Sequence, residues 1–211
     1  MKYFGGCDVG STYTKTVILD ENGAIVAANT IKSKINSAQS AKAGLDQAIA
    51  DAGLKEISDL TYLIGTGYGR NKVPQADENI SEISCHAMGV HVTDPSVRAI
   101  IDIGGQDVKG IAVDTDGTVK TFAMNDKCAA GTGRFLEMMA RTLGLSLEEM
   151  STMGLEWKEN IVISSMCTVF AESEVVSLVA QNKAVSDIIH GLNMSVASKV
   201  GALAARLGQD N

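Results

Sequence analysis

One pattern occurs twice in this chain, and it constrains the fold more than any other feature. A buried strand runs into a turn of the form Asp-x-Gly, a second strand follows, and an acidic turn with glycine leads into a third strand. The copies begin near Phe4 and near Ile100, and we call their Asp-x-Gly segments the first phosphate turn (8–15) and the second phosphate turn (102–107). A duplicated unit of this kind predicts two lobes that face each other across a cleft.

Helices and strands together give an α/β pattern. We expect an N-terminal lobe over 1–96, which carries the first phosphate turn, and a C-terminal lobe over 97–211, which carries the second. A further short strand is predicted at 62–65. Apolar residues recur at helical spacing in the remaining segments, which predicts helices at 37–52, 79–91, 132–143, 168–181 and 184–207.

Composition narrows the class of protein. The 211 residues are 45% hydrophobic, which is enough for substantial cores, and the net charge is -7. A negative balance argues against nucleic acid or an anionic membrane as the main partner. No apolar run is long enough to span a bilayer, and Asp8 interrupts the apolar start, so no signal peptide is expected. We therefore expect a cytoplasmic protein, in a compartment where structural disulfides are rare.

The first phosphate turn combines residues that suit a nucleotide. Asp8 is suited to bind Mg2+, directly or through water, and Gly10 lets the backbone approach a phosphate. Ser11 and Thr12 offer N–H and hydroxyl donors, and Lys15 adds positive charge. Taken alone, this pattern is equally compatible with an ordinary hairpin turn that exposes an acid.

The second phosphate turn favours nucleotide binding over an ordinary hairpin turn, because two such turns can hold one nucleotide from both sides. Asp102, Gly104 and Gly105 repeat the acid and the glycines at a strand end. Gln106 is a candidate to orient an attacking water, as a glutamine does in other nucleotide hydrolases. Asp107 is a candidate for the base or for a second Mg2+ contact. Neither turn is a P-loop, which has a different spacing of glycine and lysine.

Four cysteines are present without any CxxC pair. Cys7, inside a strand, and Cys85, on a helix, are most simply buried apolar side chains. Cys128 and Cys167 each precede a predicted helix, whose N-terminal N–H groups favour a thiolate or an anionic iron–sulfur cluster.

Two thiolates do not complete a four-cysteine cluster site, so a cluster requires a second chain. A two-fold homodimer supplies the same pair twice. A Cys128–Cys167 disulfide, which the cytosol disfavours, and a zinc site between subunits are the alternatives.

Gly131, Thr132 and Gly133 open the helix after Cys128. They are candidates to contact a nucleotide phosphate. The glycines equally suit a helix that starts close to a cluster.

Several long motifs resemble one known family. Segment 125–137, around Cys128, resembles the signature of the 2-hydroxyacyl-CoA dehydratase activators. Segments 164–174, 102–107 and 66–71 are similar to the same group. The family also includes the ATPase subunits of benzoyl-CoA reductase, and the resemblance covers essentially the whole chain.

This resemblance implies the fold of the sugar kinase, actin and heat-shock chaperone superfamily, with two ribonuclease-H-like lobes and ATP or ADP in the cleft between them. It implies a homodimer with one [4Fe-4S] cluster held by Cys128 and Cys167 of both subunits. It further implies that ATP hydrolysis moves the helices after these cysteines. One electron, supplied by a reduced ferredoxin or flavodoxin, then passes to a 2-hydroxyacyl-CoA dehydratase or a related acyl-CoA reductase.

One departure from the family concerns the C-terminal lobe. Family members continue past the position of Asn211 with a strand, a Gly-Gly turn that contacts adenosine and closing elements of the second lobe. We therefore expect a second lobe that is truncated relative to the family.

Two rival functions belong to the same superfamily. A small-molecule kinase needs no redox cluster. A nucleotide-sensing module, bridged by zinc or without metal, binds ATP without electron transfer.

Overall fold

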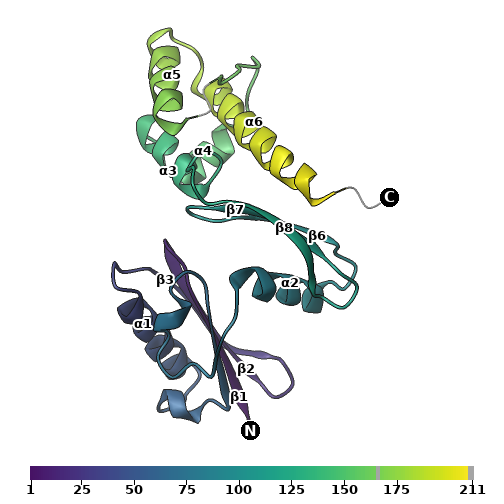
Figure 1. Ribbon diagram of the computed structural model, residues 1–211. Helices are drawn as coiled ribbons and strands as arrows, with labels where there is room; N and C mark the ends of the chain where they lie inside the picture. The colour runs from purple at the N-terminus through teal and green to yellow at the C-terminus, as the bar shows by residue number, and fades with distance from the viewer. Residues whose placement is uncertain (165–166, 209–211) are drawn as a thin grey trace. The chain divides into compact units, whose positions relative to one another are not determined.

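A computed structural model describes residues 1–164 and 167–208 of this α/β protein (Figure 1). The chain divides into two compact units, Met1–Pro95 and Ser96–Asn211, which are described one at a time. Within the described residues, no helix is both long and apolar enough to cross a bilayer.

The first unit is built on a five-stranded sheet with the order β3-β2-β1-β4-β5. The first three strands form an antiparallel meander, and β4 and β5 add to it in parallel on the β1 side. The strands are β1 (Tyr3–Val9), β2 (Tyr13–Asp20), β3 (Ile25–Lys32), β4 (Tyr62–Thr66) and β5 (Glu78–Asn79).

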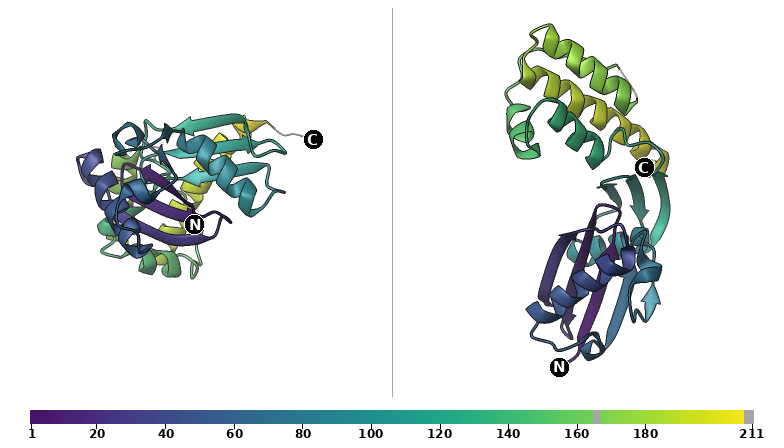
Figure 2. Two further views of the ribbon diagram at one scale, coloured as in Figure 1. Left: turned by 90° about the horizontal axis from the view of Figure 1, so that it is seen from below. Right: turned by 90° about the vertical axis from the view of Figure 1, so that its left-hand side faces the viewer.

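Helix α1 (Ser37–Asp51) covers one face of this sheet (Figure 2). The Asn36 side chain caps it by accepting hydrogen bonds from the Ala38 and Gln39 N–H groups. Its apolar face is buried with side chains from the strands: Cys7, Val9, Ile18, Ala27, Ala41, Leu45, Ala48, Ile49 and Leu63. The remaining helices of this unit are α2 (Glu82–Thr93) and the short 3-10 helices η1 (Ile57–Asp59) and η2 (Arg70–Lys72).

The second unit combines an antiparallel three-stranded sheet, of order β6-β7-β8, with four α-helices. The strands are β6 (Ala99–Ile103), β7 (Val108–Val113) and β8 (Val119–Asn125). The helices are α3 (Gly133–Thr142), α4 (Leu147–Met153), α5 (Thr168–Ala180) and α6 (Val185–Ala204), followed by the 3-10 helix η3 (Ala205–Leu207).

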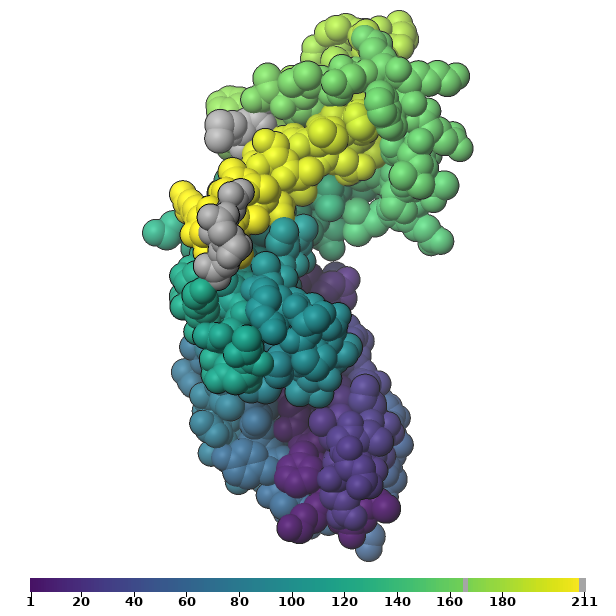
Figure 3. All heavy atoms as spheres, turned by 90° about the vertical axis from the view of Figure 1, so that its right-hand side faces the viewer, coloured from purple at the N-terminus to yellow at the C-terminus, as the bar shows by residue number. Residues whose placement is uncertain are grey.

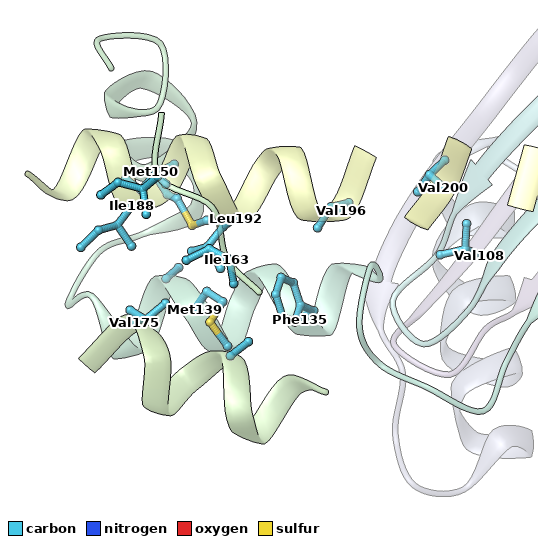
Figure 4. Packing of buried hydrophobic residues seen from close by; sticks show 14 of the residues in the cluster. Val108, Phe135, Met139, Met150, Ile163, Val175, Ile188, Leu192, Val196 and Val200 are labelled. Carbon is cyan, nitrogen blue, oxygen red and sulfur yellow. The ribbon is translucent and has the colours of Figure 1, made fainter. Parts of the chain in front are cut away.

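One apolar core joins these helices (Figure 4). Phe135 and Met139 of α3 are fully buried, and Val175 of α5 and Ile188 and Leu192 of α6 are buried with them. The exposed residues of α6, drawn in yellow in Figure 3, are mostly small or polar, with Met194 as the large apolar exception: Asn193, Met194, Ala197, Ser198, Gly201 and Ala202.

The two three-stranded meanders repeat each other in detail. The glycine of each Asp-x-Gly turn donates its N–H to the carbonyl three residues later, Gly10 to Tyr13 at 3.1 Å and Gly104 to Asp107 at 2.8 Å. The strand–turn–strand–turn–strand unit predicted from the sequence is therefore present twice. The second and third strands even shift register at corresponding places, between Ile18 and Leu19 and between Ala112 and Val113.

Candidate functional site

The first phosphate turn connects β1 to β2. A Cβ atom on Gly10 would lie 2.7 Å from the Tyr13 carbonyl oxygen, so the turn accepts only glycine there. Asp8 pairs in register with Lys15 across the two strands, and the Lys15 Nζ lies 2.9 Å from Asp8 Oδ2. The Thr12 hydroxyl is buried and has no hydrogen-bond partner. An orphaned buried donor of this kind suits an anionic ligand that supplies the missing acceptor.

A second segment, at the end of β4, meets the first phosphate turn. Thr66 pairs in register with Asp8, and its hydroxyl is also buried without a partner. Gly67 has a φ of +83°, and a Cβ atom there would collide with Asp8 Oδ1. The Thr-Gly segment after β4 therefore forms part of the wall around the Asp8 carboxylate, a role that its sequence alone left unassigned.

A cavity of about 750 Å³ within the first unit brings three of these residues together. Asp8, Lys15 and Thr66 are three of its polar lining residues, and most of its wall is apolar surface from the sheet and from α2. Charged phosphates are therefore suited to its polar edge rather than to its interior.

The second phosphate turn and the start of the strand that follows it bury two charged side chains. A Cβ atom on Gly104 would collide with Asp107 Oδ1, so again only glycine fits. Asp107 and Lys109 are buried, with the Lys109 Nζ 2.8 Å from Asp107 Oδ2 and 3.5 Å from Asp102 Oδ2.

Helix α3 begins directly on this turn. The Gly133 N–H donates to the Gly104 carbonyl at 2.9 Å, and the Arg134 N–H donates to the Gly105 carbonyl at 3.0 Å. With its amide oriented so that the oxygen faces Arg134, the Gln106 side-chain oxygen accepts hydrogen bonds from Arg134 Nε and Nη2, both at 3.2 Å. Two N–H groups at the helix start are thus bound to the backbone of the second phosphate turn.

The conformation of the segment before α3 is stabilised by hydrogen bonds to the segment's own backbone. Gly131 has a φ of +95°, a conformation that favours glycine. Thr132 is fully buried, and its hydroxyl donates to the Ala129 carbonyl at 2.6 Å. Phosphate binding by Gly131, Thr132 and Gly133 stays a prediction, and the observed geometry makes them the link between the turn and the helix.

Cys128 and Cys167 are both exposed and free. Cys167 is the N-cap residue of α5, and no side chain caps that helix start. Cys128 precedes α3, as predicted: the turn around Gly131 follows it, and Thr132 is the N-cap of the helix. Residues 165–166, which precede Cys167, lie outside the described residues.

The two remaining cysteines differ. Cys7 is fully buried in β1, and burial raises the pKa of its thiol to about 11. Cys85 is half-buried on α2.

One chain supplies two of the four cysteine ligands that a four-cysteine cluster site requires, Cys128 and Cys167. Within 1–164 and 167–208, no three His, Cys, Asp or Glu side chains gather closely enough to hold a metal. Two exposed thiols per chain match the ligand set of a [4Fe-4S] cluster only when a second chain contributes its own pair.

Three residues of this site escaped the sequence analysis: Thr66, Gly67 and Lys109. A lysine at the same interval after the aspartate in both turns was the available signal for Lys109. Thr66 and Gly67 had no such internal repeat to identify them, because only the parallel pairing of β4 with β1 brings them to Asp8.

Comparisons with known proteins identify relatives of the whole chain. The model of the BadF/BadG/BcrA/BcrD ATPase family matches residues 6–211. The activator of lactoyl-CoA dehydratase from Anaerotignum propionicum is 49% identical over 206 residues, which are 98% of this chain and 79% of that protein. The activator of the 2-hydroxyisocaproyl-CoA dehydratase from Clostridium difficile, solved with bound ADPNP, has a TM-score of 0.91 at 44% identity, covering 99% of this chain and 78% of that one.

A distant structure shows the fold alone. A chain from Chromobacterium violaceum, described as an N-acetylglucosamine kinase, matches with a TM-score of 0.53 at 12% identity over 99% of this chain and 84% of its own. Together these matches confirm the predicted α/β fold of the sugar kinase and actin superfamily. The chain belongs to the BadF/BadG/BcrA/BcrD ATPase family.

Proposed function

We propose that this protein is an ATP-dependent activator that couples ATP hydrolysis to one-electron transfer. The acceptor is a 2-hydroxyacyl-CoA dehydratase or a related acyl-CoA reductase, and a [4Fe-4S] cluster lies between two copies of the chain. Two relatives, at 49% and 44% identity, are activators of such dehydratases. The expected electron donor is a reduced ferredoxin or flavodoxin, in the cytoplasm, where exposed cysteines remain thiols.

The two phosphate turns take complementary roles in this proposal. Asp8 binds Mg2+ at the first turn, and the buried, unpartnered Thr12 hydroxyl supports a phosphate ligand beside it. Gln106 orients the attacking water, and Asp107 accepts its proton. The remaining cofactor-binding residues are proposed to be Gly10, Ser11, Lys15, Asp102, Gly104, Gly105, Gly131, Thr132 and Gly133.

One observation carries the proposed coupling: the start of α3 is hydrogen-bonded to the second phosphate turn. The Gly104 and Gly105 carbonyls each accept an N–H from the first residues of α3. A change in the turn on loss of the γ-phosphate therefore changes the position of α3 and of the loop that carries Cys128. ATP drives such a change only if it binds the two arrangements with different affinity.

Helix α5 moves with α3 in this proposal because the two pack as one body. Phe135 and Met139 of α3 share a buried core with Ala171 and Val175 of α5. The Thr142 hydroxyl also donates to Glu172 Oε1 at 3.1 Å across the pair. Since Cys167 is the N-cap residue of α5, a shift of α3 reaches both cysteine-bearing segments.

A second copy of the chain is the proposed partner for the exposed side of α5. Val169, Phe170, Val176 and Val179 leave 64%, 67%, 55% and 45% of their surfaces exposed on this helix. Exposed apolar residues gathered on one helix favour an interface, and a second copy adds the cysteines that a four-thiolate site requires. When bound there, the cluster supplies a low-potential electron.

Cys128→Ser, with Cys85→Ser as the matched control, tests this function on protein purified without oxygen. We expect dithionite-reduced parent protein to deliver electrons to a 2-hydroxyacyl-CoA dehydratase only with ATP. Cys128→Ser loses that transfer and keeps ATP hydrolysis, and Cys85→Ser keeps both. ATP hydrolysis without electron transfer in the parent protein would contradict the proposal and favour a kinase or a sensor.

A further inference from the structure

Two lysines occupy equivalent positions in the two repeated units. Lys15 pairs in register with Asp8 between β1 and β2, and Lys109 pairs in register with Asp102 between β6 and β7. The Lys15 side chain is 53% exposed, whereas that of Lys109 is 4% exposed. The same residue at the same position of the repeat therefore lies in two different environments.

One neighbour distinguishes the two environments. Lys109 lies between the Asp107 and Asp102 carboxylates, at 2.8 Å and 3.5 Å. The residue that corresponds to Asp107 in the first unit is Tyr13, which is 44% exposed and offers Lys15 no second carboxylate. A buried ammonium needs such partners, because its desolvation is not compensated otherwise.

Asp107 in turn determines the shape of the second phosphate turn. Its carbonyl accepts the Gly104 N–H at 2.8 Å, and its carboxylate packs against the Gly104 backbone where a Cβ atom would be. Gly104 also accepts the first N–H bond from α3. Whatever holds the Asp107 side chain therefore holds the turn, the adjacent Gln106 and the start of the helix.

We propose that Lys109 is a positioning residue for ATP hydrolysis, and that its counterpart Lys15 binds phosphate. Lys109 keeps Asp107 and Asp102 in place, and it reduces the negative charge that the second phosphate turn presents to the nucleotide. Lys15, exposed and paired with one carboxylate, is able to leave Asp8 and contact a phosphate. The inference rests on the proposed ATP hydrolysis and assigns different tasks to two residues that the repeat makes equivalent.

Lys109→Met and Lys15→Met separate the two tasks by steady-state ATP hydrolysis, which requires neither a cluster nor a partner enzyme. Misplacement of Gln106 and Asp107 is expected to lower kcat of Lys109→Met about 100-fold with little change in KM. Loss of a charged phosphate contact is expected to raise KM of Lys15→Met about 10-fold. An unchanged kcat in Lys109→Met, or an effect on KM alone, would overturn the assignment.

The double variant Lys109→Met/Asp107→Asn tests whether Lys109 acts through Asp107, and it leaves no buried carboxylate at 107 without its cation. If Lys109 acts through Asp107, the double variant has the same kcat as Asp107→Asn, because removing Lys109 has no further effect once the Asp107 carboxylate is gone. A kcat of the double variant well below that of Asp107→Asn would overturn the assignment, and this comparison holds even if Lys109→Met alone fails to fold. An absence of turnover in the parent protein would overturn the proposed hydrolysis and this role with it.

Discussion

At the residue scale, the phosphate turns depend on glycines whose missing side chains leave room for a carboxylate. Gly104 leaves room for Asp107, and Gly67 leaves room for Asp8. The second case is the more informative, because Gly67 comes from a distant part of the chain. Its φ of +83° and its contact with Asp8 together make the position specific for glycine.

Gly67→Ala is therefore expected to impair ATP turnover, and Gly53→Ala is its matched control. Gly53 has a similar φ of +71° but no neighbour within 4 Å of an added Cβ atom. Both variants should lose about 1 kcal/mol of stability from backbone strain, and Gly67→Ala should lose more, because its Cβ atom would also lie 2.8 Å from the Val9 carbonyl oxygen. Only Gly67→Ala displaces Asp8, so only it should lower kcat/KM for ATP, by about 10-fold or more. Equal turnover in the two variants would show that Asp8 lies outside the site.

At the element scale, periodicity predicted the long elements well. Helix α1 was expected at 37–52 and is Ser37–Asp51, and the five predicted helices and the six strands of the two meanders are all present. The predicted helix at 184–207 is α6 followed by η3. In these elements the buried apolar residues recur at helix or strand spacing over enough residues for the local sequence to predict the element type.

The elements that were not predicted are short or depend on distant partners. Helix α4 spans only Leu147–Met153, and its signal was the capping box formed by Ser146 and Glu149. Strand β5 is Glu78–Asn79, which forms only because β4 offers it a parallel edge. The candidate site residues were predicted in the two turns that repeat along the chain. Thr66 was not assigned, because only the pairing of β4 with β1 brings it beside Asp8.

Asp187, in the first turn of α6, binds the backbone of the loop at 158–159 through its side chain. Its carboxylate accepts from the Lys158 and Glu159 N–H groups at 2.6 Å and 3.0 Å. These hydrogen bonds hold the pKa of Asp187 below its usual value. The carboxylate therefore stabilises the fold above the unfolded-state pKa, about 3.9, and this contribution is lost as the pH falls through the lower folded-state pKa.

Thermal unfolding of Asp187→Asn across pH tests this contribution. We expect a lower Tm than the parent at pH 7 and a difference that shrinks as the pH falls through the lowered folded-state pKa, where the parent carboxylate takes up a proton. Asp46→Asn, which removes an exposed carboxylate paired with Lys42, should change Tm little at either pH. A pH-independent deficit in Asp187→Asn would mean that packing rather than charge explains it.

At the scale of the whole molecule, the proposed function requires a second chain. Each chain supplies two exposed thiols and an exposed apolar side of α5 that begins at one of them. The same helix is buried against α3 on its other side, so it is suited to transmit a change from the phosphate turn to a dimer interface.

Phe170→Ser should weaken that dimer. Phe170 is 67% exposed on α5, and truncation of a central aromatic residue typically costs an interface about 2 kcal/mol or more, roughly 30-fold in Kd. Val92→Ser, at a position 75% exposed on α2, serves as the control and should leave the Kd unchanged. Sedimentation equilibrium without oxygen measures both. Equal dimerisation of the two variants would place the interface elsewhere.

Iron and acid-labile sulfide, measured together with molar mass on protein purified without oxygen, test the central claim most directly. A cluster shared by two chains predicts a dimer with about four iron and four sulfide, or about two of each per chain, and none of either in Cys128→Ser. A metal-free or zinc-only dimer, or a full cluster retained by Cys128→Ser, would contradict it.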